Sequence, residues 1–231
     1  MSVIRGKGNI VAGRNIVVRG NGNTVIGGQY GPAGCASGVI IGSGKVKSER
    51  RMLERIGRIV LSGPASLLFT RSATPFVRVT ADDNILPFIV TRASGNSLTI
   101  ESSGNFSTRN EILVEVEMPS LEALTAQGSG NVELNDIEQP SLQVNLVGSG
   151  NIKIAGKVDY FTVELNGSGD IKANSLKSRS AVLLLNGSGD IRAHASDSVK
   201  VRLNGSGDIE VSGRHTRRDC MIGGSGNIGF E

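Results

Sequence analysis

Apolar and polar positions alternate in short runs along most of this chain, and in its second half the runs recur about every 19 residues. The period at residues 167–186 is typical, with a Gly-Ser-Gly turn, a short run at 170–173, a polar stretch and a second run at 181–186. Alternation with a period of two puts Ile171 and Ala173 on one side of the first run. The pattern therefore predicts short β-strands, each with one buried side.

The turn before each strand carries the same motif, Gly-Ser-Gly followed by Asn or Asp. Its six copies start at Gly128, Gly148, Gly167, Gly187, Gly205 and Gly224, so the gaps are 20, 19, 20, 18 and 19 residues. A fixed period of this length is the mark of a solenoid, in which each period is one coil stacked on the last. A unit of two or three short strands is too small to be stable alone, so stacking must supply the core.

Stacking makes each strand pair in parallel with its equivalent one period later, at a spacing of about 4.8 Å. The same position then forms an apolar column along the rod, and we expect the variation in coil length to be taken up in loops. The first predicted column is Ile152, Ile171, Ile191, Ile209 and Ile228, and the second is Leu146, Leu165, Leu185 and Leu203. A β-sandwich or a propeller is the alternative, but a propeller blade needs about 40 residues, or two periods. We therefore predict an all-β protein, a parallel β-helix with coils of about 19–20 residues.

The first half of the chain is less regular. Residues 1–47 are rich in Gly and Asn and predict an N-terminal extension, an irregular coil or ribbon, separate from a β-helix at 48–231 whose strict repeats begin at 128. Residues 48–58 have the only helix-like pattern, although a short strand fits them nearly as well. Between 76 and 117 alternating runs predict further strands, which we expect to form the start of the coil.

Composition narrows the class of protein. Aromatic residues make up 3% and Trp is absent, so the core must be aliphatic. The net charge of +4 is spread thinly, whereas a nucleic-acid binder carries a dense basic stripe, so we expect no nucleic-acid partner. Two cysteines, Cys35 and Cys220, are too few for a disulfide framework.

The chain shows no export or membrane segment. Its first thirty residues lack the apolar run of about 7–15 residues that a signal peptide needs. No stretch approaches the roughly 18 apolar residues of a membrane-spanning helix. We therefore expect a cytoplasmic protein with no membrane span, or a surface or secreted one if a leader was removed.

Two rows of polar residues are the candidate binding sites. Asp170, Asp190 and Asp208 share one motif position, and stacked carboxylates could bind calcium. Asn occupies this position in the other motifs, which favours a structural role in which either side chain bonds the local backbone of the turn. Lys172 and Arg192 lie two residues on and could neutralise the row. We therefore predict neither a metal site nor a cofactor here.

The second row consists of Asn166, Asn186 and Asn204, which precede the motif in the same three coils. Stacked amides can form an internal hydrogen-bonded ladder, so here too a structural role is favoured over ligand binding. We expect His194 and His215 at the surface and Cys220 in the core of the last coil. No residue is predicted to be catalytic.

The six motifs resemble those of the head-GIN domain family, the heads of autotransporter adhesins. The resemblance extends upstream to 60–64, 79–87 and 116–124, so it covers about residues 56–231. It implies a right-handed parallel β-helix, and the family's adhesin description carries no proven activity with it.

We therefore predict a non-enzymatic binding or adhesin-like protein, with a polysaccharide or a protein as its ligand. One alternative is a cytoplasmic scaffold similar in kind to bactofilin filaments, and a second is a polysaccharide-acting β-helix enzyme. A β-helix leaves unpaired strand edges at its ends, so we also expect a homo-oligomer formed through them.

Overall fold

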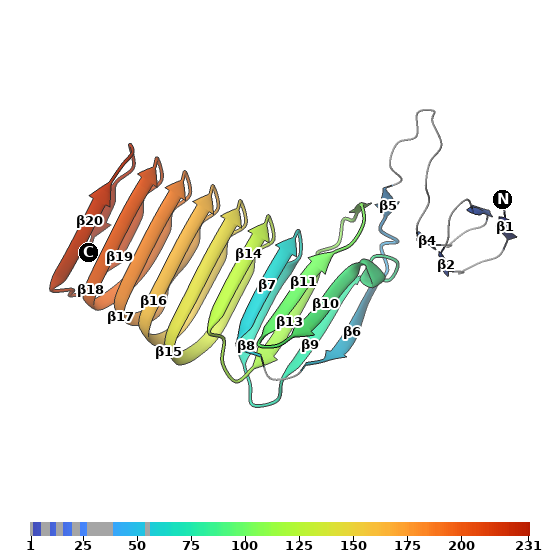
Figure 1. The fold of residues 1–231 in the computed structure, drawn as a ribbon, viewed down its shortest axis with the longest axis horizontal. Helices are drawn as coiled ribbons and strands as arrows, with labels where there is room; N and C mark the ends of the chain where they lie inside the picture. The colour runs from blue at the N-terminus through green and yellow to red at the C-terminus, as the bar shows by residue number, and fades with distance from the viewer. Residues whose placement is uncertain (1, 6–9, 13–15, 20–23, 27–38, 54–55) are drawn as a thin grey trace.

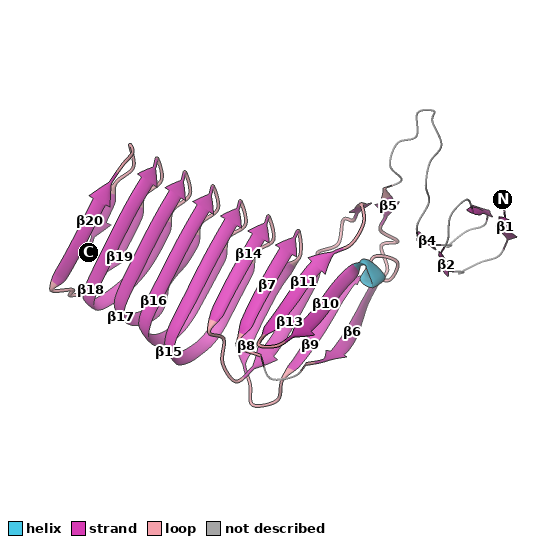
Figure 2. Ribbon diagram, in the orientation of Figure 1, coloured by secondary structure: helices cyan, strands magenta, loops and turns pink. Residues whose placement is uncertain are grey.

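The computed structural model describes residues 2–5, 10–12, 16–19, 24–26, 39–53 and 56–231. Coils stacked side by side form a rod, with the C-terminal coil at one end (Figure 1). Strands account for nearly all of the regular structure (Figure 2). No helix in the described ranges is long and apolar enough to cross a membrane. The predicted all-β parallel β-helix is confirmed.

The regular part of the rod is built from eight strands. Each of the four long ones bends round the rod, so that its first residues lie on one side and its last residues on the other. We call the side that follows each Gly-Ser-Gly turn the leading side, and the side that precedes the next turn the return side. The strands are β14 (Ala123–Gly128), β15 (Val132–Gly148), β16 (Ile152–Gly167), β17 (Ile171–Gly187), β18 (Ile191–Gly205), β19 (Ile209–Ser212), β20 (Arg217–Ile222) and β21 (Ile228–Phe230).

The register of these strands is the one that the repeat predicts. On the leading side Ile152 pairs with Ile171, which pairs with Ile191, and the column continues to Ile209 and Ile228. On the return side the predicted leucine column is likewise in register from β15 to β18. Both columns are confirmed.

Variation in coil length is taken up at the corner between the two sides. The register of β15 on β16 shifts between Leu134 and Ile137, and that of β17 on β18 shifts between Ala173 and Lys177. Asp136, at the first of these irregularities, has a positive φ of 56°. The expectation that separate loops absorb the difference is wrong, because bulges inside the long strands do so.

The first half of the rod does not stack in sequence order. β7 (Arg58–Gly63) lies between β11 (Ser97–Ser102) and β14, and β8 (Ser66–Arg71) lies between β13 (Leu113–Met118) and β15. The chain therefore forms one coil with β7 and β8, places β11 and β13 on one side of it, and crosses back to place β14 on the other. Residues 119–122 make this crossing.

Antiparallel strands close this end of the rod. β10 (Ile89–Ser94), which follows the 3₁₀ turn η1 (Leu86–Phe88), pairs antiparallel with β11. β9 (Phe76–Asp82) pairs antiparallel with β13. β6 (Val46–Met52) adds a further antiparallel strand to β9. The antiparallel strands β6, β9 and β10 thus form an N-terminal cap on the stack of parallel strands, which the repeats alone do not indicate.

The helix considered for residues 48–58 is wrong, and the alternative of a short strand is right. From residue 48 to residue 52 β6 pairs with β9, while residues 54–55 lie outside the described residues. Arg50 and Arg78 from the two strands lie over the ring of Phe76, at 4.4 and 5.5 Å from its centroid. Pairing with a ready strand edge therefore outweighs a weak local preference for helix. β6 also spans the proposed boundary at residue 47, and the division of the chain there stays a prediction.

The N-terminal strands repeat with a shorter period. β1 (Ser2–Arg5) pairs in parallel with β3 (Ile16–Arg19), and β2 (Ile10–Ala12) pairs in parallel with β4 (Thr24–Ile26). Ser2 lies opposite Ile16 and Ile10 opposite Thr24, so both offsets are 14 residues. β5 (Ile40–Ile41) pairs with β12 (Phe106–Ser107).

One continuous core runs along the rod, from Leu53 to Val211. It is aliphatic except for Phe69, Phe161 and the thioether of Met118, which are among its largest fully buried side chains. The core position predicted for Cys220 is wrong. Cys220 is in register with buried Val201, yet it is exposed, because β18 is the only described strand that pairs with β20.

The two glycines of each motif are required by the stacking itself. A Cβ on Gly169 would lie 1.9 Å from the carbonyl oxygen of Gly150, and a Cβ on Gly167 would lie 2.0 Å from that of Gly148. That same Gly148 oxygen accepts the N–H of Ser168 at 3.0 Å. Gly167 also has a φ of 150°, but Gly169 has no left-handed φ, so close approach of the backbones is the general reason for glycine here.

We expect Gly169→Ala to destabilise the rod by about 1–3 kcal/mol, because its Cβ forces two coils apart in a packed stack. Gly229→Ala is the matched control, since the nearest atom to its Cβ would be 3.6 Å away. Thermal and urea unfolding followed by circular dichroism measures both. Equal stability of the two variants would contradict the proposed role of the motif glycine.

Candidate functional site

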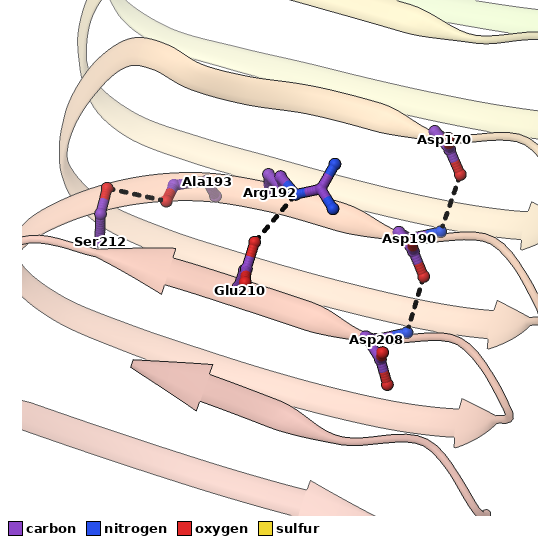
Figure 3. A network of polar contacts seen from close by, with 7 residues as sticks. All are labelled: Asp170, Asp190, Arg192, Ala193, Asp208, Glu210 and Ser212. Atoms are coloured by element: carbon purple, nitrogen blue, oxygen red, sulfur yellow. Dashed lines mark hydrogen bonds and ion pairs between the residues drawn. The ribbon is translucent and has the colours of Figure 1, made fainter. Parts of the chain in front are cut away.

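The aspartate row lies on the leading side, immediately after the Gly-Ser-Gly turns. Oδ1 of Asp170 accepts the backbone N–H of Asp190 at 3.2 Å, and Oδ1 of Asp190 accepts that of Asp208 at 2.9 Å (Figure 3). Oδ1 of Asp208 accepts the N–H of Asn227 at 2.9 Å. Each side chain thus bonds the equivalent residue of the next coil.

The same bond continues through the asparagines of the earlier coils. Oδ1 of Asn131 accepts the N–H of Asn151 at 3.2 Å, and Oδ1 of Asn151 accepts the N–H of Asp170 at 3.1 Å. Asn and Asp are interchangeable here because both offer one oxygen to the next coil. The expected bond to the local backbone of the turn is wrong, and the actual bond links neighbouring coils.

Arg192 does not act mainly on the aspartate row. Its Nε lies 2.8 Å from Oε2 of Glu210 (Figure 3), and this hydrogen bond and the charge of Glu210 are the main reasons why the pKa of Arg192 is raised. The charges of Asp190 and Asp170 add smaller effects on that pKa. Both partners are exposed, so this pair contributes little to stability.

Calcium takes six to eight oxygen ligands. In the row, one oxygen of each aspartate is already an acceptor for a backbone N–H. Across the described residues no three His, Cys, Asp or Glu side chains are grouped so that they could hold a metal ion. The row has the geometry of a stacking ladder.

The asparagine row forms a second ladder. Nδ2 of Asn186 donates to Oδ1 of Asn166 at 2.9 Å, and Nδ2 of Asn204 donates to Oδ1 of Asn186 at 3.0 Å. Asn166 also donates to Glu164 at 2.9 Å. The predicted ladder is confirmed, but it is not internal: Asn166 and Asn186 are half-buried and Asn204 is exposed. At the preceding coil Val147 interrupts the row.

The histidines differ from each other. His194 is half-buried, and its Nδ1 lies 3.2 Å from the hydroxyl of Ser212. The surface position expected for His215 is wrong, because it is 6% exposed and its ring lies 5.1 Å from that of Phe230. The guanidinium carbon of Arg218 lies 4.4 Å from the centroid of the Phe230 ring. His215, Phe230 and Arg218 therefore partly close the C-terminal end of the core.

Sequence reasoning missed Asp82, a buried carboxylate in the N-terminal cap. Its Oδ2 accepts the hydroxyl of Thr108 at 2.8 Å, and its Oδ1 accepts the side-chain amide of Asn110. Hydrogen bonds lower the pKa of Asp82, the largest effect coming from Asn110 and smaller ones from Thr108 and the backbone N–H of Gly44. Burial of the carboxylate acts in the opposite direction. The carboxylate joins β9 to two loops, and the only signal for it in the sequence is the polar run Asp82-Asp83-Asn84, which is typical of a turn.

The aspartate ladder predicts that charge at this position is unnecessary. We expect Asp170→Asn, Asp190→Asn and Asp208→Asn combined to leave the melting temperature unchanged or raised, because the amide oxygen still accepts and carboxylates about 5 Å apart no longer repel. The matching triple alanine variant loses three bonds of about 0.5–1.5 kcal/mol each. Differential scanning calorimetry with and without millimolar Ca²⁺ tests both variants. A rise in the wild-type melting temperature with Ca²⁺, absent from the asparagine variant, would instead indicate a metal site.

Several solved structures have a similar fold. An adhesin of Bacteroides fragilis, described as putative, superposes with a TM-score of 0.70 at 21% identity, over 83% of this chain and 100% of that chain. A putative lipid binding protein of Parabacteroides distasonis gives a TM-score of 0.55 at 24% identity, over 84% and 100%. A putative adhesin of the same species gives 0.59 at 19% identity, over 84% and 100%. At these identities the likeness shows the fold alone.

Among curated proteins no match was found. A family model does match, over residues 57–214, and it spans most of the regular rod together with β7 to β13. The model is described as "Putative auto-transporter adhesin, head GIN domain". The match covers well over half of the chain and contains the motif copies from Gly128 to Gly205. The chain therefore belongs to the head GIN domain family.

Proposed function

We propose that this protein is a non-enzymatic, adhesin-like binding protein that acts at the cell surface. The observation that carries the proposal is the return side of the rod, where outward polar side chains repeat in register on a rigid scaffold. Gln143 of β15 pairs with Thr162 of β16, and two residues further along the same strands Asn145 pairs with Glu164. Stacked coils of this kind provide extended surfaces for binding.

The relatives support this proposal by their descriptions. The description of the family model names the head domain of an adhesin, and two of the three solved structures named above are described as adhesins. An adhesin meets its ligand outside the cell, so the family gives no support to the cytoplasmic location expected from the sequence. A surface location is therefore part of the proposal.

The location can be tested on native cells. We expect a membrane-impermeant biotin reagent to label the protein on intact cells, with detection by antibody after fractionation. A cytosolic marker from the same cells must remain unlabelled, as the control for lysis. Recovery of the protein only in the unlabelled cytosolic fraction would contradict the proposal.

End-to-end self-assembly is a second candidate, favoured by the C-terminal coil. All six residues of β20 are exposed, and Ile222 continues the core column of Leu203 although it is 50% exposed. Met221 is 57% exposed beside it. An open strand edge next to exposed apolar side chains suits pairing with a second copy of the chain.

We expect the wild-type protein to associate as its concentration rises in sedimentation velocity experiments. Ile222→Lys should abolish this association, because it places a charge on the open end of the core. Val147→Lys, on the side of the rod at 41% exposed, is the matched control and should still associate. A wild-type protein that stays monomeric at every concentration would exclude this candidate.

A further inference from the structure

A shallow hollow of about 540 Å³ lies on the return side, where the N-terminal part of the rod meets the regular coils. Residues of the crossing segment at 119–122, of β7 and β14, and of β15 and β16 line it together. Its lining includes Arg58, Ser120, Glu122, Gln139, Gln143 and Tyr160. Neither polar row of the repeats contributes to it.

Tyr160 stands free at the edge of this hollow. It is 63% exposed, and no other aromatic side chain in the described ranges is an exposed one. Its register partners on the two neighbouring coils are Ser141 and Ser180. Because both partners are small, they leave the faces of the ring open along the rod. An aromatic ring with an open face offers apolar contact area together with a polar hydroxyl.

The lining residue Gln139 is held by three hydrogen bonds. Its side-chain oxygen accepts the N–H of Leu121 at 2.9 Å, and its side-chain nitrogen donates to the carbonyl oxygens of Leu121 and of Ser141. The amide therefore fastens the crossing segment to β15. The hollow is held in shape by hydrogen bonds, so a ligand would not have to order it.

Glu122 is also held in place. Its backbone N–H donates to the carbonyl oxygen of Gly57 at 2.7 Å, and its Oε2 accepts the side chain of Asn96 at 3.3 Å. Arg58, which follows Gly57, and Gln143 are exposed beside it. The hollow thus presents one acid, one base and two amides, with no net charge.

We propose that this hollow binds a neutral saccharide. The Tyr160 ring packs against the C–H face of a pyranose, and Arg58, Glu122 and Gln143 hydrogen-bond its hydroxyl groups. The balanced charges favour an uncharged sugar over an acidic one, and the polar lining favours a sugar over a lipid chain. This inference rests on the proposed binding function and names its ligand class.

Isothermal titration calorimetry of the full chain tests the proposal with hexasaccharides of the cellulose, laminarin, starch, mannan and chitin series. We expect at least one of them to bind. Tyr160→Ala should weaken that binding at least tenfold, whereas Tyr160→Phe keeps the ring and most of the affinity. Val147→Ala, which removes an exposed apolar side chain elsewhere on the return side, is the matched control and should bind as the wild type does.

Failure of all five sugars, or equal binding by wild type and Tyr160→Ala, would overturn the saccharide proposal. Retention of a phospholipid vesicle by the wild type in place of any sugar would overturn it as well. These outcomes leave the surface proposal standing, which the biotin labelling decides separately. New reducing ends after incubation with the bound sugar would show hydrolysis and would contradict the non-enzymatic part of the proposed function, while the sugar site itself would remain.

Discussion

The rod depends on one steric constraint, the close approach of successive backbones at the Gly-Ser-Gly turn. A single methyl group on Gly169 or Gly150 would overlap a carbonyl oxygen of the preceding coil. Without side chains at these points, the carbonyl of the first glycine can accept N–H groups from the next turn, as the Gly148 oxygen does from Ser168 and Gly169. The turns then stack at strand spacing, and the strands on either side are brought into register.

The polar rows beside the turn follow from the same constraint. Once the turns are stacked, the residue after the turn lies one coil spacing from its equivalent, so an Asn or Asp oxygen reaches the next backbone N–H. The asparagines before the turn reach each other in the same way. The most repetitive polar residues of the chain are thus those that join the coils. Their regularity is a reason to seek a ligand site elsewhere, at positions that do not repeat.

Repetition also decides how much of the structure the sequence predicts. The isoleucine and leucine columns follow from the period, because each position has the same neighbours in every coil. The ends of the array lack this regularity. Cys220 occupies a core column but lies on β20, which pairs with only one described strand, and His215 is buried beside Phe230 from β21. The position of β7 between β11 and β14 depends on contacts between segments far apart in the sequence, for which no local pattern exists.

The hollow beside Tyr160 could not be predicted from the sequence, for the same reason. No repeat pattern singles out Tyr160, because its equivalents in the neighbouring coils are serines, yet those serines are what leave its ring exposed. Ser120 and Glu122 of the lining belong to residues 119–122, which exist as a crossing segment only because the chain stacks out of order. A uniform solenoid would present identical coils and no such break. In this protein the departure from the repeat, at the point where the cap joins the regular coils, provides a concave surface that the repeat alone cannot form.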